Sequence, residues 1–340
     1  MRLPAGPDVV VWDTTYACPL RCSHCYSESG RRPARQLDPA DLLRVTDGII
    51  ALRPRLVGLS GGEPLAVKGL FEAGERLAAA GIRTAVYTSG WRTAPWMPGE
   101  LARVFDEVLV SVDGATARVH DRIRGRSGSF ERAMATLALF DDLARRRRAD
   151  GRRPFAFGIE CTVMHSNAGQ LHRFCTEIAP RFPELRSLAF NIAVPAGLAS
   201  RPEFELAELL DDARVAQLTH PARVTRLAEL APPSVRVSFT DNRELMMHPD
   251  RAAPAVIHVE PDGAVRAMPV YEGTVGNLLQ DPPLELWERA LERRRDPFVV
   301  ETLRPVRTMR DWARAIRHID LHFGSPEVRA RIAARPGLAR

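Results

Sequence analysis

The chain has 340 residues, of which 45% are hydrophobic and 26% charged, values typical of a globular protein with one large α/β domain and at most a small appendage. No apolar run approaches the ~18–20 residues of a membrane helix and no signal-peptide core is present, so we expect a cytoplasmic protein without membrane contact. The net charge of +6 is modest and comes almost entirely from arginine, so we expect no nucleic-acid partner.

The first part of the chain alternates strand and helix patterns. Residues 9–15 predict a strand that ends at a cysteine-rich loop. Residues 37–54 predict an amphipathic helix with Asp38 as its N-cap and Pro39 in its first turn. Further strands with their loops are predicted at 55–64, 83–90, 107–114, 155–164 and 185–197, and helices at 70–81, 101–105, 129–148 and 168–180.

Six such strand–helix units in about two hundred residues favour a parallel sheet with crossover helices. The polar and glycine-rich stretches all follow strands: the cysteine loop, SGGEP, TSG, SVDG and NIAVPAG. Ligands of parallel α/β folds bind at the carboxyl ends of the strands. We therefore expect these five loops to share one face.

The pattern changes after about residue 200. Residues 204–218 predict a helix, and 234–240 predict a strand. Residues 256–270 predict a hairpin that turns at Pro261, Asp262 and Gly263, because Asp-Gly between alternating apolar residues is a strong turn signal. Residues 281–295 predict a helix capped by Asp281. The basic tail from residue 309 predicts one or two amphipathic helices, which either pack on the body or grip an acidic substrate segment.

Three of the five cysteines stand close together, as Cys18, Cys22 and Cys25. A structural zinc site would need a fourth ligand, and His24 lies awkwardly between two of the thiols. A catalytic cysteine does not explain three thiols, and a CxxC redox pair leaves Cys18 without a role. A [4Fe–4S] cluster with three thiolates and one open iron fits the spacing.

The spacing Cys18-x3-Cys22-x2-Cys25 after the first strand resembles the signature of the radical S-adenosylmethionine (SAM) superfamily. SGGEPL at residues 60–65 resembles the family's GGEP motif, and residues 111–130 resemble the segment after the fourth strand in its peptide-modifying branch. His24 departs from the pattern, since the family usually has an aromatic residue there. The resemblance covers residues 9 to about 195 and implies an α/β fold, a partial (βα)6 TIM barrel with a small C-terminal β-hairpin/helix domain.

The resemblance also implies cofactors and site residues. In the family, the open iron binds SAM, and reductive cleavage yields a 5′-deoxyadenosyl radical that abstracts a substrate hydrogen. The implied cofactors are one [4Fe–4S] cluster and SAM. The implied cluster ligands are Cys18, Cys22 and Cys25. The residues expected near SAM are Tyr26, Gly61, Gly62, Glu63 (ammonium), Pro64, Ser89, Ser111 and Asp113 (ribose), and Arg124 (carboxylate), with Arg122 as its alternative.

Glu160 and Cys161 are neighbours in the fifth predicted strand, so their side chains face opposite sides of the sheet. An unpaired carboxylate buried against the helices would be costly. We therefore predict that Glu160 points into the barrel, towards SAM or substrate, as the candidate catalytic residue. Cys161 then packs between sheet and helices, and Cys175 in the next helix is expected to be structural.

The C-terminal part resembles the SPASM or twitch extension of peptide-modifying radical SAM enzymes, which carries cysteines for auxiliary clusters. No cysteine occurs after Cys175, and Met268 stands where the first hairpin cysteine would be expected. We therefore expect a degenerate, cluster-free extension. The expected organisation is a core at 1–200, a helical connection at 201–232, the SPASM/twitch-like unit at 233–300 and the basic tail at 301–340.

The resemblance implies a radical SAM enzyme that modifies a ribosomally made precursor peptide by crosslinking, epimerisation or another C–H functionalisation. A small-molecule substrate, such as a nucleoside or sugar intermediate of natural-product biosynthesis, is the alternative. We expect no separate peptide-recognition module before the barrel, which weakens the peptide case. The expected electron donor is a reductant such as flavodoxin or ferredoxin. A non-catalytic iron–sulfur electron carrier is a third hypothesis, but a carrier has no use for the GGEP segment.

Overall fold

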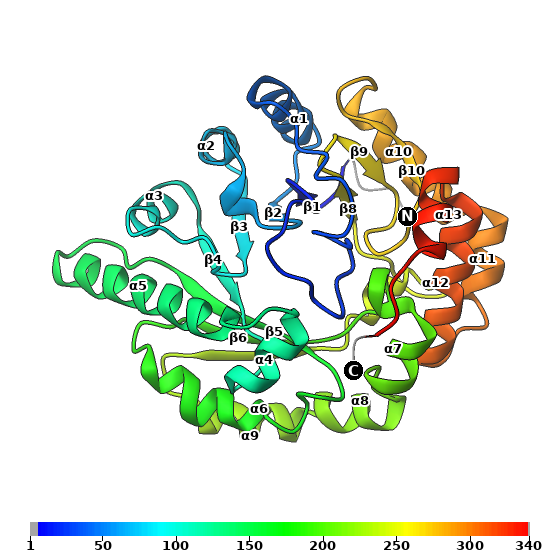
Figure 1. The fold of residues 1–340 in the computed structure, drawn as a ribbon. Helices are drawn as coiled ribbons and strands as arrows, with labels where there is room; N and C mark the ends of the chain where they lie inside the picture. Colours follow the sequence, from blue (N-terminus) through cyan, green and yellow to red (C-terminus); the bar gives the residue numbers. More distant parts are fainter. Residues whose placement is uncertain (1–5, 339–340) are drawn as a thin grey trace.

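The computed structural model describes residues 6–338, which form a ten-stranded sheet with helices packed around it (Figure 1). The strands are β1 Val9–Asp13, β2 Leu56–Ser60, β3 Arg83–Thr88, β4 Glu107–Ser111, β5 Phe157–Val163, β6 Ser187–Ile192, β7 Arg236–Thr240, β8 Val256–Val259, β9 Ala264–Arg266 and β10 Thr274–Asn277. Their order across the sheet is β10-β9-β8-β1-β2-β3-β4-β5-β6-β7.

The helices follow the strands in chain order. They are α1 Pro39–Ala51, α2 Leu70–Ala79, α3 Met97–Val104, α4 Ala117–Arg124, α5 Ser129–Ala149, α6 Leu171–Arg173, α7 Pro202–Ala207, α8 Asp212–Thr219, α9 Pro221–Leu230, α10 Pro283–Arg294, α11 Pro297–Leu303, α12 Met309–Phe323 and α13 Pro326–Ala333. Across residues 6–338, no helix is both long and apolar enough to cross a membrane.

Strands β1 to β6 are parallel and lie side by side in sequence order, which confirms the predicted parallel sheet. Their inner residues, such as Val57, Val86 and Val108, are fully buried, because a parallel sheet covered by helices hides both faces of its strands. Figure 1 shows α1, α2, α3 and α5 outside the curved sheet and the dark-blue loop after β1 inside the curve. The curved parallel sheet confirms the predicted α/β class.

Local signals set the first helix as predicted. The Asp38 side chain accepts a hydrogen bond from the backbone N–H of Asp41 at 2.9 Å, and Pro39 begins α1. The hairpin is confirmed as well, because Glu260 and Ala264 close the turn between β8 and β9 and Gly263 adopts φ +81°. Glycine is suited to this turn because it has no Cβ to clash in the left-handed region.

The predicted cap at Asp281 is wrong. Helix α10 begins at Pro283 with Pro282 as its N-cap, and no side chain caps it. The Asp281 carboxylate instead accepts hydrogen bonds from the Asn277 backbone N–H and from Arg289, each at 2.8 Å. Competition from these two donors keeps Asp281 on the turn after β10.

The C-terminal strands extend both ends of the parallel sheet. Strand β7 pairs in parallel with β6, whereas β8 pairs in parallel with β1. The part of the chain after residue 233 therefore shares one sheet with the core, and the domain boundaries near 200, 233 and 300 stay predictions. Helix α12 buries Met309, Trp312 and Ile316, so the first half of the basic tail packs on the body.

Candidate active site

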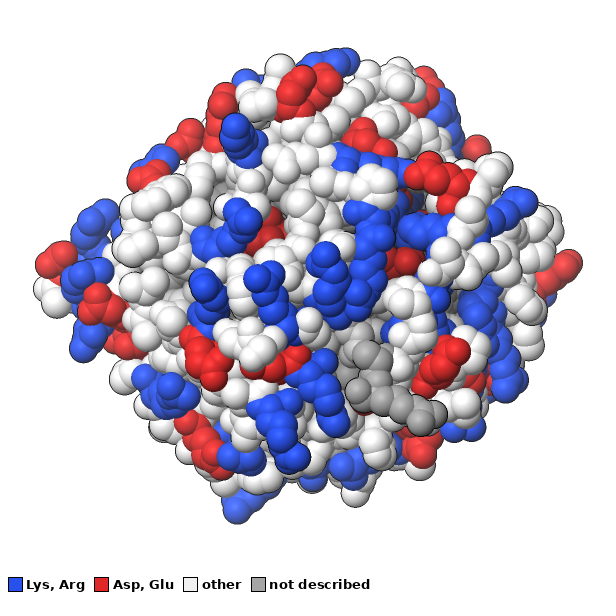
Figure 2. Space-filling model, in the orientation of Figure 1, with Lys and Arg blue, Asp and Glu red and all other residues white. Residues whose placement is uncertain are grey.

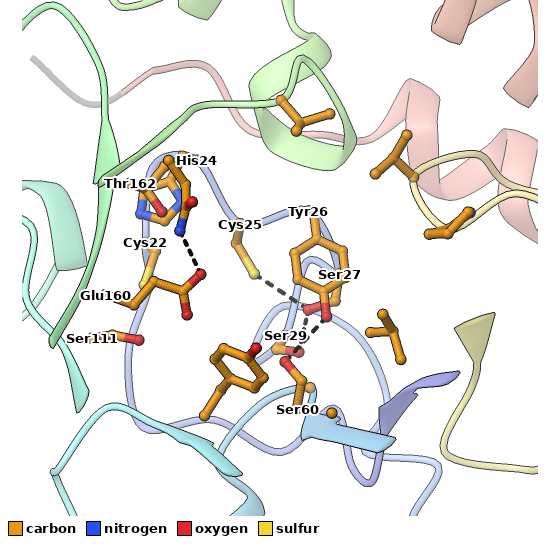
Figure 3. Close-up of a pocket in the computed structure, with 18 of the residues that line it drawn as sticks. Cys22, His24, Cys25, Tyr26, Ser27, Ser29, Ser60, Ser111, Glu160 and Thr162 are labelled. Atoms are coloured by element: carbon orange, nitrogen blue, oxygen red, sulfur yellow. Dashed lines mark hydrogen bonds between the residues drawn. The ribbon is translucent and has the colours of Figure 1, made fainter. Parts of the chain in front are cut away.

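A cavity of about 420 Å³ opens at the carboxyl ends of the parallel strands (Figure 3). Figure 3 shows Ser111 and Glu160 on one wall, Tyr26 and Ser60 on the other, and Cys22 and Cys25 between them. The predicted residues that line this cavity are Cys18, Cys22, Cys25, Tyr26, Gly61, Gly62, Ser89, Ser111, Arg124 and Glu160. Parallel strands thus gather at one place the loops that the sequence marked.

The cysteine loop is held close to the loop that follows β2. The Gly62 and Glu63 N–H groups donate to the carbonyls of Thr15 and Ala17 at 2.6 and 3.0 Å. Gly61 adopts φ +113°, and a Cβ at Gly62 would lie 2.1 Å from the Ala17 carbonyl oxygen. The two glycines are therefore required for the approach of these loops to each other, as well as lining the cavity.

Glu63 lies behind the cavity wall rather than on it. Its carboxylate accepts hydrogen bonds from the Thr88 hydroxyl at 2.7 Å, from the Ser89 N–H at 3.0 Å and from the Ser89 hydroxyl. The side chain is fully buried, and Pro64 beside it is buried as well. Glu63 therefore positions Ser89, which does line the cavity, and its predicted contact with the SAM ammonium stays a prediction.

Asp113 is also fully buried, at the centre of a charged cluster. Its carboxylate lies 2.7 Å from Arg124 Nε and 2.9 Å from His24 Nε2, and it accepts a hydrogen bond from the Thr162 N–H at 2.8 Å. Burial alone would raise the pKa of Asp113, but Arg124 and His24 hold that pKa well below its usual range. The predicted contacts of Asp113 with ribose and of Arg124 with the SAM carboxylate stay predictions.

The same cluster reaches the cysteine loop. Arg124 Nη1 lies 3.8 Å from the Cys22 sulfur, and the Cys22 thiol is buried. His24, which departs from the family pattern, ties the segment between Cys22 and Cys25 to the end of β4 through Asp113. This ion-paired cluster therefore fixes the loop that carries the three thiols.

Glu160 faces the cavity and Cys161 faces the core, as the alternation along the strand predicted. Glu160 Oε1 accepts a hydrogen bond from Asn191 Nδ2 at 2.7 Å, whereas Cys161 is fully buried among apolar side chains. Burial raises the pKa of Glu160 to about 7, so its carboxyl group is poised to exchange a proton near neutral pH. Its catalytic role stays a prediction.

Replacing Glu160 with glutamine should lower the rate of 5′-deoxyadenosine formation by roughly ten- to a hundredfold, the range for a lost hydrogen bond to a charged group. Cys161→Ala is the control, because it changes a buried neighbour on the opposite face of the same strand. The rate with and without substrate, compared with wild type, measures the effect. A larger loss in Cys161→Ala than in Glu160→Gln would reject the assignment of the two faces.

A buried polar group at the opposite wall was missed from the sequence. The Tyr26 hydroxyl donates to Asp13 at 2.5 Å, and Asp13 lies 2.9 Å from His258 Nε2. His258 Nδ1 lies 2.8 Å from the carbonyl oxygen of Pro269, which also lines the cavity. His258 stands alone in the apolar strand β8, and only the pairing of β8 with β1 brings it to Asp13.

The donor set suits a thiolate-bound iron–sulfur cluster. All three thiols are free and line one cavity. Burial raises the pKa of Cys18 to about 12 and of Cys22 to about 11, so these thiols stay protonated until a metal centre replaces the proton. Within residues 6–338, no three His, Cys, Asp or Glu side chains converge on a position for a single metal ion. The thiols stand apart, as the ligands of a multi-iron cluster do.

Residues 12–149 match the Radical SAM superfamily, and this part of the chain is a radical SAM domain. A [4Fe–4S] cluster and SAM, the cofactors predicted from the cysteine spacing, are those of this family.

Three relatives lie close in sequence. The AdoMet-dependent heme synthase of Methanosarcina barkeri is 31% identical over 196 residues, 56% of this chain and 52% of that protein. The mycofactocin maturase MftC of Mycolicibacterium smegmatis is 31% identical over 178 residues, 52% and 43% of the two chains. The PqqA peptide cyclase of Ruegeria pomeroyi is 35% identical over 140 residues, 41% and 37%. The chain spans about half the length of the first two relatives or less.

The fold has a solved counterpart. The structure of Streptococcus suis SuiB bound to precursor peptide SuiA superposes with a TM-score of 0.65 at 13% identity, over 89% of this chain and 68% of SuiB. At this identity the likeness concerns the fold, and it extends beyond the radical SAM domain into the C-terminal part of the chain.

Proposed function

We propose that this protein is a radical SAM enzyme that cleaves SAM reductively and abstracts a hydrogen atom from a substrate. The observation that carries the proposal is the joint placement of three free thiols, the glycine loop and Glu160 around one cavity in a radical SAM domain. When bound, the cluster supplies the electron that cleaves the sulfonium of SAM.

The residues of this chain divide the remaining work. Cys18, Cys22 and Cys25 hold the iron, and the close approach of Gly61 and Gly62 to the cysteine loop shapes the adjacent floor of the cavity. Ser89, positioned by Glu63, and Ser111 offer hydroxyl groups to the polar parts of SAM. The surrounding apolar side chains exclude water from the radical.

The substrate we propose is a peptide made as a ribosomal precursor. The relatives named for peptide cyclisation and for mycofactocin maturation support this choice, since their similarity lies in the same domain. A small-molecule substrate is the second candidate, and the heme synthase similarity favours it. A short open reading frame for a precursor peptide beside the gene would favour the peptide, and its absence the small molecule.

We also propose one cluster per chain, a SPASM/twitch-like C-terminal region without auxiliary clusters and a location in the cytoplasm. The last described cysteine, Cys175, lies in the core, and Met268 on the hairpin side is buried. A reducing compartment keeps cluster thiols free, which supports the cytoplasm. An electron carrier such as flavodoxin or ferredoxin would supply the reductant.

Anaerobic reconstitution tests the proposal. The protein should bind about four irons and four sulfides per chain and convert SAM with dithionite into 5′-deoxyadenosine and methionine in equal amounts. Iron and sulfide analysis and chromatography of the products measure both. A loaded protein that forms no 5′-deoxyadenosine would contradict the proposed enzyme and leave the iron–sulfur carrier hypothesis. A markedly higher iron count would contradict the cluster-free C-terminal region.

A further inference from the structure

Four exposed arginines surround the outer side of the cysteine loop. Arg21 and Arg31 lie on the loop itself, Arg126 follows α4, and Arg132 lies in α5. We call these four residues the loop-face patch. Among the ion pairs of residues 6–338, none joins any of the four to an acidic side chain. Figure 2 shows arginines gathered at the middle of this face, over the dark-blue loop of Figure 1.

Backbone carbonyls hold the patch in place without neutralising it. Arg21 Nη1 donates to the carbonyls of Cys18 and Leu20 at 3.0 and 2.8 Å, and Arg31 Nη2 donates to the Arg21 carbonyl at 2.7 Å. Arg126 donates to the Pro19 carbonyl at 2.7 Å. The first three guanidinium groups are thus ordered directly above the segment that carries Cys18 and Cys22.

The fourth arginine joins through an aromatic ring. The guanidinium carbons of Arg126 and Arg132 lie 3.9 and 4.5 Å from the centroid of the Trp91 ring. Arg132 also donates to the Trp91 carbonyl at 3.3 Å. Cation–π stacking of this kind holds two positive charges near each other on the surface.

The acids near the loop do not offset this charge. Glu28 is 3% exposed, and its carboxylate is already bound by two arginines of the C-terminal tail. Asp38 accepts the N-cap hydrogen bond of α1 at the far end of the loop. The outer face of the ligand loop is therefore a positively charged surface with an ordered geometry.

We propose that the loop-face patch is the docking surface for an acidic one-electron carrier protein. This inference rests on the proposed function, in which an external donor must bring electrons to the site of Cys18, Cys22 and Cys25. Docking on the loop that holds these ligands gives the electron the shortest path through the protein. The carrier is oxidised by one electron and the cluster site is reduced by one, with no bond or proton transferred.

Charge and position favour a carrier over a substrate. None of the four arginines lines the cavity, where a substrate carbon must lie to meet the radical. Redox partners form small, short-lived interfaces. Complementary charge speeds such encounters and makes their rates fall with salt. A few ordered, unpaired arginines suit this kind of contact.

The test compares two reductants on the reconstituted enzyme. The variant Arg31→Glu/Arg132→Glu reverses two charges of the patch that lie outside the cavity. Arg181→Glu/Arg186→Glu is the matched control, since both arginines are exposed, lack an acidic partner and precede β6 at the opposite end of the sheet. Flavodoxin is the probe, with its reductase and NADPH; dithionite is the chemical reductant.

We expect the patch variant to bind flavodoxin roughly tenfold more weakly at low salt, with a smaller loss at high salt. The rate of 5′-deoxyadenosine formation at limiting flavodoxin should fall in proportion, while the dithionite-driven rate equals that of wild type. The control should match wild type in all three measurements.

Unchanged flavodoxin binding in the patch variant would overturn the proposal. An equal loss with dithionite would also overturn it, and would assign these arginines to the loop structure. A raised KM for substrate with either reductant would assign the patch to substrate binding. If wild type forms no 5′-deoxyadenosine with dithionite, the proposed function fails, whereas flavodoxin binding still reports on the docking surface separately.

Discussion

Replacing Cys22 with alanine should abolish 5′-deoxyadenosine formation and most iron binding. Cys22 is the most buried thiol of the loop, and its sulfur lies 3.8 Å from Arg124 Nη1. With only Cys18 and Cys25 left, the loop offers two thiolates to a cluster that needs three from the protein. Iron and sulfide analysis after anaerobic reconstitution, followed by product chromatography with SAM and dithionite, measures the loss.

Two buried cysteines outside the loop serve as matched controls. Cys161 and Cys175 are fully buried in the core, in β5 and in the helix after α6. Their alanine variants should keep wild-type iron and sulfide contents, although each loses some stability from the small void. If Cys22→Ala retained iron and turnover, or if Cys175→Ala lost them to the same extent, the ligand assignment would be wrong.

Short-range patterns were sufficient to predict the elements that carry the site. The alternation of strands and helices predicted the parallel sheet, and Gly61, Gly62 and Ser111 follow or end strands that meet at one edge. Alternation along a single strand also predicted that Glu160 and Cys161 face opposite sides. These signals are local, so one sequence contains them in readable form.

Long-range partners were not predictable in the same way. Glu63 bonds to Ser89, and Asp113 bonds to His24, which lies 89 residues away in the chain. Both acids occupy motif positions that suggested direct cofactor contact. The motif gave the location of each carboxylate, but not the donors that the fold would bring to it.

The edges of the sheet show the same limit. The short strands β7 and β8 each carry an ordinary strand pattern, and nothing local indicates that one joins β6 and the other β1. Only that pairing places His258 beside Asp13 and Tyr26 at the cavity wall. The polar group at this wall therefore became visible only in the folded chain.

The basic tail was expected to pack on the body or to grip a substrate, and its arginines instead bind the cysteine loop. Arg335 Nη2 lies 2.8 Å from the Glu28 carboxylate, across 307 residues of chain, and Arg331 binds the same oxygen. Arg331 also binds Glu272, which pairs with the buried Arg266 of β9. Glu28 thus joins the tail, the hairpin and the ligand loop in one buried ionic network.

Replacing Glu28 with alanine should lower the free energy of unfolding by about 3–5 kcal/mol, the cost of removing one partner from a buried ion pair. The side chains of Glu28 and Arg335 are only 4% and 5% exposed, so water cannot replace the lost carboxylate readily. Chemical denaturation followed by circular dichroism measures this change. Because Glu28 lies in the ligand loop with φ +54°, the variant should also reconstitute less iron than wild type.

The exposed pair of Glu100 and Arg103 provides the contrast. Both side chains are about half exposed, so water and salt already screen their interaction, and Glu100→Ala should leave the unfolding midpoint nearly unchanged. Glu28→Gln keeps the shape and part of the hydrogen bonding but not the charge, so its midpoint should lie between those of Glu28→Ala and wild type. A Glu28→Ala protein as stable as Glu100→Ala, with full iron content, would show that the tail does not brace the ligand loop.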